Sequence, residues 1–212
     1  IPDIAPFLSP ELIITFFDAI SIVVANNPRE AVKMEQLDFI IQPLNEQWKE
    51  CMDDFNPGDG DIAQRIAFIL SCNSVIAFNI RQVFADQFLL IFPQMMMAYS
   101  GFSANVAGIL MSGQPINPDF LKAVIQAKNA TIEVTKNFVS RISNPSQILG
   151  GILGPLMDTV FAEYGNMPNP RARTPEVLNL LTVLFSKMKD SIMDFLNPIL
   201  EELPLHSWQE EM

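Results

Sequence analysis

Few residues in this chain could do chemistry, and none has the partners that catalysis requires. The only histidine, His206, stands in the terminal stretch with no evident partner to orient it. A serine or cysteine nucleophile depends on such an oriented base. Gly150, Gly151 and Gly154 form a glycine-rich run, but it lacks the Lys and the Ser or Thr of a phosphate-binding loop. We therefore predict no catalytic residue, no cofactor-binding residue and no enzyme activity.

Metal binding also lacks a complete set of ligands. Asp59 and Asp61 lie in a glycine-containing loop similar to a calcium loop, but the bidentate Glu expected downstream is missing. Cys51 and Cys72 stand 21 positions apart with no second pair, which fits neither a zinc site nor a disulfide framework. The sequence therefore predicts no metal site and two buried thiols of a reducing compartment.

The charge of the chain bears on its partners. Its 212 residues include 13 basic and 24 acidic ones, for a net charge of −11, which opposes binding to a phosphate backbone and excludes nucleic acid as a partner. Residues 1–106 carry 5 basic and 13 acidic residues, and residues 107–212 carry 8 and 11. The densest acidic cluster is Glu46, Glu50, Asp53, Asp54, Asp59 and Asp61. It is interpreted either as a solvated helix end and loop or as a docking site for a basic protein.

One uncharged stretch, from Gln87 to Pro118, is long enough to span a bilayer. Pro93 and several polar residues interrupt it, and its flanks, Asp86 and Asp119, are acidic rather than basic. We therefore predict no membrane insertion. The stretch is expected to hold a helix buried on two sides and broken at or near Gly101.

Apolar residues recur at helical spacing along the chain, and no segment alternates as a strand would. Four helix starts have a capping residue followed by proline, at Ser9-Pro10, Asn117-Pro118, Asn144-Pro145 and Thr174-Pro175. Pro43 predicts a break within the second helix, which continues beyond it, and no clear pattern defines the segment 102–112. The predicted helices span about 10–25, 28–52, 61–79, 82–99, 118–142, 145–164, 175–188 and 191–202.

These helices occur in pairs whose first members begin near Pro10, Asp61, Pro118 and Pro175. Repeated hairpins with broad apolar faces favour an all-α fold, an α-solenoid of antiparallel helix hairpins, with a compact helical bundle as the alternative. We predict about four units, at approximately 1–56, 57–116, 117–169 and 170–212. The residues predicted to be largely buried are Phe84, Phe88, Phe92, Leu181, Leu184 and Phe185.

Arg171 and Arg173 occupy a proline-rich loop directly before an apolar helix. Because the arginine fork binds carboxylates well, these two residues are expected either to pair with acidic residues of an adjacent unit or to meet a partner. Both interpretations stay open at the level of sequence.

The stretch from Gly154 to Leu178 resembles a segment of the exportin-1 family, nuclear export receptors within the karyopherin-β (importin-β) superfamily. The matching residues are Pro155, Leu156, Asp158, Val160, Tyr164, Ala172, Arg173, Pro175, Glu176, Val177 and Leu178. Scattered further matches extend from about Pro10 to Leu200. Two departures indicate a distant relative: Pro43 stands one place earlier than the corresponding family proline, and Thr174 replaces an acidic residue.

This resemblance implies a segment of HEAT-like repeats from the C-terminal half of a nuclear export receptor. In that family a ring-like solenoid binds the GTP-bound form of the small GTPase Ran (Ran-GTP) together with export-signal cargo, and passes nuclear pore proteins as it shuttles between nucleus and cytoplasm. The cargo groove lies just upstream of the matched segment, so neither Cys51 nor Cys72 is given a role in it.

The resemblance also implies inner helices that face Ran, where acidic residues would meet a basic GTPase. It assigns no partner-binding residue in this chain. The alternative is an unrelated helical-repeat scaffold for protein interactions that shares only the architecture, since a fold does not by itself imply a function.

Overall fold

The computed structural model of the chain describes residues 8–143, 145–166 and 174–188. Within these ranges the secondary structure is helical and contains no strand, which confirms the all-α prediction. The helices are α1 (Pro10–Ala25), α2 (Glu30–Asp53), α3 (Gly60–Ile80), the 3₁₀ turn η2 (Arg81–Phe84), α4 (Ala85–Met111), α5 (Pro118–Arg141), α6 (Pro145–Leu156), the π-helical segment η3 (Met157–Phe161), α7 (Ala162–Asn166) and α8 (Pro175–Met188).

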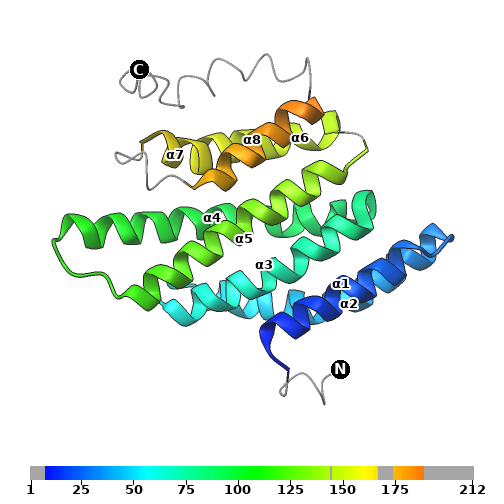
Figure 1. Ribbon diagram of the computed structural model, residues 1–212, viewed down its shortest axis with the longest axis horizontal. Coiled ribbons are helices and arrows are strands. Elements are labelled where there is room, and N and C mark those ends of the chain that lie inside the picture. The colour runs from blue at the N-terminus through cyan, green and yellow to red at the C-terminus, as the bar shows by residue number, and fades with distance from the viewer. Residues whose placement is uncertain (1–7, 144, 167–173, 189–212) are drawn as a thin grey trace.

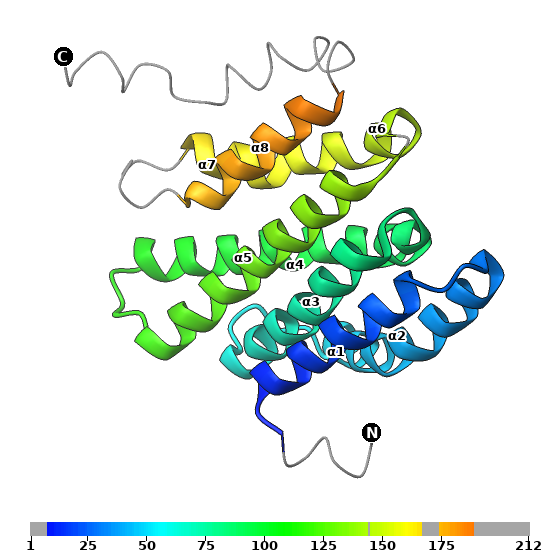
Figure 2. The ribbon, with the colours of Figure 1, turned by 45° about the vertical axis from the view of Figure 1, so that its right-hand side comes forward.

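The helices form two layers (Figure 1). Helices α1, α3, α5 and α8 lie side by side in one layer, which we call the ladder layer, and α2, α4 and the run α6–η3–α7 lie behind them in the outer layer (Figure 2). In the ladder layer α3 contacts both α1 and α5, and α5 contacts α8. Each unit thus packs mainly on its neighbours, as expected for a helical-repeat fold.

Side-chain caps explain where three ladder helices begin. Ser9 accepts the backbone N–H of Leu12 at the start of α1. Asp59 accepts the N–H groups of the residues that open α3, and Asn117 does the same for α5. These bonds satisfy donors that a helix leaves without an internal partner, and the starts at Pro10, Pro118 and Pro175 agree with the predicted ones.

The core lies between the two layers. Phe88 of α4 stacks on Phe138 of α5 with ring centroids 4.1 Å apart, so the two layers are joined by aromatic packing. Of the six residues predicted to be buried, Phe84, Phe88, Phe92, Leu181 and Leu184 are buried and Phe185 is partly buried. The helical periodicity therefore identified the face of α4 and of α8 that packs inward.

The predicted break at Pro43 is wrong, because α2 continues through it to Asp53. Proline removes the N–H that would bond to the carbonyl four residues earlier, at Phe39. Both residues are exposed, so this carbonyl lies on the side of the helix that water reaches. Leu44, the next residue, and Trp48, just over one turn beyond Pro43, are buried in the core and hold the helix in place.

The predicted break near Gly101 is also wrong. Helix α4 runs without interruption to Met111 and includes the segment that the sequence left poorly defined. A side chain at Gly101 would place its Cβ 3.0 Å from Cε1 of Phe55. The glycine therefore permits a close approach of the loop after α2 to α4, which is a packing role rather than a helix-breaking one.

The helices predicted in the C-terminal part of the chain have different outcomes. The helix expected at about 145–164 is present as the continuous run α6–η3–α7. The helix expected at 191–202 lies outside the described residues, as do Arg171, Arg173 and His206. The division of the chain into four units with the stated boundaries stays a prediction.

Among the described residues, one helical stretch, between Gly60 and Met111, is long and apolar enough to cross a membrane, and 44% of its most apolar part is buried inside the protein. A core helix of a soluble protein has the same properties, so this stretch is only a weak indication of a membrane span.

Candidate interaction surfaces

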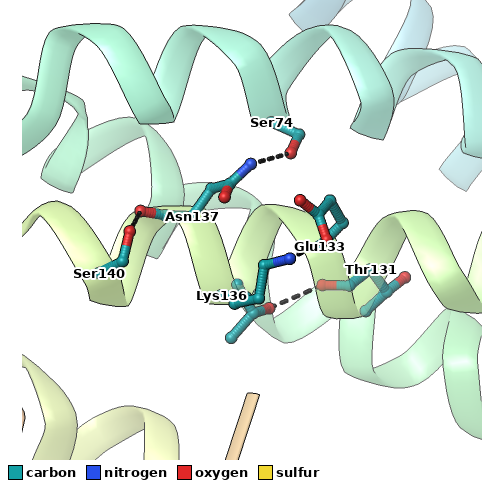
Figure 3. A network of polar contacts seen from close by, with 7 residues as sticks. Ser74, Thr131, Glu133, Lys136, Asn137 and Ser140 are labelled. Carbon is teal, nitrogen blue, oxygen red and sulfur yellow. Dashed lines mark hydrogen bonds and ion pairs between the residues drawn. The ribbon is translucent and has the colours of Figure 1, made fainter. Parts of the chain in front are cut away.

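Polar contacts set the register of neighbouring ladder helices. Figure 3 shows Asn137 of α5 donating its side-chain amide to the Ser74 hydroxyl of α3, over 2.9 Å. Lys136, the residue before Asn137 on α5, forms an ion pair with Glu133, which lies one turn earlier. Because Ser74 is buried, its hydroxyl would lose hydrogen bonding if α3 and α5 slipped past each other. The contact therefore favours one alignment of the two helices.

The joint between α1 and α3 uses the same type of residue. The side-chain amide of Asn79 donates to the Asp18 carboxylate and to the Ser21 hydroxyl, each over 2.8 Å. Ser21 is fully buried, whereas Asp18 and Asn79 are half-buried, so this joint is partly shielded from water. A second buried joint links the layers, where Gln87 of α4 donates to Asn45 of α2 and to Asn73 of α3.

A groove of about 570 Å³ crosses the solvent side of the ladder layer. Three carboxylates line it from three different helices: Glu11 of α1, Glu133 of α5 and Glu176 of α8. Only Glu133 has a basic partner, Lys136, among the described residues. We call this surface the ladder-face groove. Its negative charge suits a basic protein surface better than an acidic one.

The ladder face is also the concave side of the stack. Helix α3 packs along much of α5 in the ladder layer, whereas α2 and α4 of the outer layer have almost no backbone contact. Helices that are close on one side and spread on the other make the stack curve toward the close side. Concave faces of this kind are the usual binding surfaces of helical-repeat proteins.

A second groove, of about 700 Å³, is more apolar and lies between the α4–α5 pair and the α7–α8 pair. We call it the α4–α8 groove. Its walls include exposed Leu110 and Ile125. Lys128 lies in it, paired with Glu163 and 4.5 Å from the ring centroid of Tyr99. Burial and the nearby Glu163 raise the pKa of Tyr99. Lys128 and Glu163 are therefore paired within the protein, whereas Glu176, which also lines this groove, has no ion pair among the described residues.

The acidic cluster singled out in the sequence is mainly solvent-exposed. Glu46, Glu50, Asp53 and Asp54 are exposed on the last turns of α2 and its cap. Asp59 is the half-buried cap of α3, where its carboxylate accepts the backbone N–H groups of Asp61 and Ile62. Glu50 pairs with Arg65 over 2.9 Å, with both side chains largely exposed, and such a pair contributes little to stability.

Both cysteines are buried free thiols, as predicted. Burial raises the pKa of Cys72 to about 12, and burial is also the main cause of the raised pKa of Cys51. A thiol with a raised pKa holds almost no thiolate at neutral pH, so neither cysteine is suited to nucleophilic chemistry.

Sequence reasoning named no partner-binding residue, and the structure shows why. Each groove is lined from helices that are far apart in the sequence, such as Glu11 and Glu176. The periodicity of a single helix says which of its faces is apolar, but not which other helix borders that face. The local hint of a groove was an apolar residue outside the buried face of its helix, such as the exposed Leu110 of α4.

Comparison with known proteins identifies relatives of this chain. Residues 87–206 match the family model described as CRM1 C terminal. Protein Exportin 1B of Arabidopsis thaliana is 24% identical over 195 residues, covering 88% of this chain and 18% of the relative. Exportin-1 of Drosophila melanogaster is 19% identical over 226 residues, covering 94% of this chain and 21% of the relative.

The chain thus spans about a fifth of the length of these relatives. The family match includes the stretch from Gly154 to Leu178, whose motifs had indicated the same family from sequence alone. That prediction is confirmed, as a distant relationship. Because the family model covers more than half of its residues, the chain belongs to the CRM1 C terminal family.

Proposed function

We propose that this chain is a segment of a nuclear export receptor that carries leucine-rich export-signal cargo out of the nucleus together with Ran-GTP. The observation that carries the proposal is the family match, together with similarity to exportin-1 proteins over 88% and 94% of the chain. In this proposal the segment acts as a scaffold: its hairpins hold the neighbouring parts of a ring in a fixed geometry.

The ladder-face groove is the proposed contact surface for Ran. It lies on the concave side and carries Glu11, Glu133 and Glu176, so it would attract a basic GTPase surface. Acidic groups at such an interface mainly speed association and set specificity, and their effect weakens as salt rises. The groove for the export signal is proposed to lie outside this chain, and nuclear pore proteins are proposed as further partners of the receptor.

The rest of the proposal follows from the transport role. The receptor would shuttle between nucleus and cytoplasm, would not be an enzyme, and would neither bind nucleic acid directly nor insert into a membrane. The net charge of −11 supports the exclusion of nucleic acid.

The test compares binding of the 212-residue chain to Ran loaded with GTP and with GDP, at low and at physiological salt. We expect weak binding that prefers the GTP form, because a full ring would hold Ran at several places at once. The variant E11Q/E176Q should bind more weakly than the wild type, and D53N/D54N, which makes the same charge change elsewhere, should bind like the wild type. Binding that is independent of salt, or equal loss in both variants, would count against the ladder face.

Cargo binding is tested on the same chain with a fluorescent leucine-rich export-signal peptide. We expect no saturable binding, because the cargo groove is proposed to lie outside the chain. Tight binding of this peptide by the isolated chain would contradict that placement.

A further inference from the structure

The outer layer contains a groove that the proposed function does not use. It lies where α2 and α4 diverge, has a volume of about 380 Å³ and continues along α2 into a shallower extension. We call it the outer groove. Its lining residues are Met34, Leu37, Asp38, Ile41 and Asn45 of α2, Val83 of η2, and Asp86, Gln87 and Leu90 of α4.

The base of the outer groove is preformed. Leu37 and Ile41 are buried. The side-chain amides of Asn45 and Gln87 bond to each other reciprocally, over 3.0 and 2.7 Å. The polar groups at the base are therefore satisfied within the protein, and they are fixed rather than free to bind a ligand.

Apolar side chains at the edge of the groove remain open to solvent. Met34 is 50% exposed on α2, and Leu90 is 66% exposed on α4. Phe39, at 74% exposed, lines the extension next to them. Together they offer an apolar surface on which the apolar side chains of a partner could be buried.

The charges of the groove indicate what kind of partner it suits. Asp38 and Asp86 line it from its two bordering helices, both are exposed, and no basic residue lines this deeper part. Among the described residues neither carboxylate forms an ion pair, since the ion pairs present join other residues. In the extension Lys49 is the one basic lining residue, and it lies there with the acidic Asp38 and Glu46. In the α4–α8 groove, by contrast, Lys128 already neutralises Glu163.

We propose that the outer groove binds a polypeptide segment of a partner protein in which an arginine or lysine is flanked by apolar residues. The cationic side chain would lie between Asp38 and Asp86, and the apolar residues would cover Met34 and Leu90. Charge-assisted hydrogen bonds to carboxylates give such a contact its specificity, and the buried apolar area gives it affinity. The proposal does not depend on the transport function.

The charge of the chain argues against two other occupants. A second copy would bring a net charge of −11 to an acidic groove. The terminal residues 189–212 carry one basic residue, Lys189, and six acidic ones. Both would be repelled by Asp38 and Asp86, whereas a basic partner segment would be attracted.

The experiment titrates the 212-residue chain with a fluorescein-labelled helical peptide that has leucines along one face and one arginine between them. A matched peptide carries citrulline in place of arginine, which keeps the shape and removes the charge. D38N/D86N should weaken binding of the arginine peptide about tenfold or more, the range expected for charge-assisted hydrogen bonds. It should leave the weaker citrulline peptide unchanged, and L90S should weaken both peptides.

Two control variants make the test selective. D53N/D54N removes the same two charges from the exposed end of α2, outside the groove, and should leave binding unchanged. L110S alters the α4–α8 groove and should also have no effect. Equal affinity for the two peptides, no binding at millimolar peptide, or loss of binding in either control would overturn the proposal. So would sedimentation that shows a dimer of the chain dissociated by D38N/D86N, because the occupant would then be a second copy.

Discussion

The ladder layer and the outer layer differ in how regular their helices are. In the ladder layer, α1 and α5 carry proline only in the first turn, and α1, α3 and α5 all begin at a side-chain cap. In the outer layer, α2, α4 and α6 each contain an internal proline, at Pro43, Pro93 and Pro155. Helices α2 and α4 begin without a side-chain cap, and the third outer run contains the π-helical segment η3.

This difference indicates that packing between the ladder helices sets the geometry of the stack, and that the outer helices adapt to it. On the concave side α3 and α5 pack closely, so an irregular helix there would disturb its neighbours. On the convex side the helices are spread apart and much of their surface faces water, which can satisfy a carbonyl freed by proline. The outer layer can therefore tolerate irregularity and open grooves, and the predictions below test that asymmetry.

The largest expected effect is the loss of an aromatic ring where the ladder layer meets the core. Phe138→Ala removes a fully buried side chain that stacks on Phe88, and it should lower the free energy of unfolding by about 3–5 kcal/mol. Phe39→Ala, on the exposed side of α2, should change it by less than about 0.5 kcal/mol. Urea denaturation followed by circular dichroism measures both. Similar losses of stability in the two variants would contradict the proposed asymmetry between the layers.

The second prediction compares a polar joint in each setting. Asn79→Ala leaves the Asp18 carboxylate and the buried Ser21 hydroxyl without their shared donor, and it should cost about 1–3 kcal/mol. Gln94→Ala removes the acceptor of the Trp48 indole N–H in the outer layer. Gln94 is exposed, so water can accept this bond in its place, and we expect a smaller loss, measured by the same denaturation. A larger loss for Gln94→Ala would show that outer-layer joints matter more than ladder joints.

The same asymmetry explains what could be predicted from the sequence. The ladder helices were predicted well, because Ser9-Pro10 and Asn117-Pro118 are local signals and the apolar period is regular. The two errors, at Pro43 and Gly101, both fall in the outer layer. There, packing against distant residues such as Phe55 overrides the local signal.

The grooves could not be predicted for a related reason. A groove depends on the distance between helices that are remote in the sequence, and no pattern within one helix gives that distance. The family was recognised because its motif, from Pro155 to Leu178, is a continuous local pattern. Asp38 and Asp86 were visible in the sequence as isolated acidic residues, and only the fold places them along the same groove.

A third, smaller effect is expected from a ladder cap. Asn117→Ala removes the acceptor for the N–H of Asp119, 2.8 Å away, and should destabilise the protein by about 1 kcal/mol. Arg29→Ala, at the start of α2, removes no capping bond and should have no measurable effect. Thermal unfolding of the two variants side by side provides the comparison. Equal behaviour would mean that the ladder caps do not specify the helix starts.

The smallest expected effect is a gain in stability in the outer layer. Gly150 and Gly151 lie in α6, are exposed, and a Cβ at either would meet no atom within 4 Å. Alanine loses less backbone entropy than glycine in a helix, so each substitution to alanine should add about 0.5–1 kcal/mol. Hydrogen exchange along α6 and η3 should slow at the same time. Gly101→Ala, whose Cβ would press on the Phe55 ring, should instead lower stability. Opposite changes in the free energy of unfolding would therefore distinguish a glycine that loosens the outer layer from a glycine that packing requires. If Gly150→Ala and Gly151→Ala also destabilised the protein, these glycines would serve a contact rather than the looseness of the convex side.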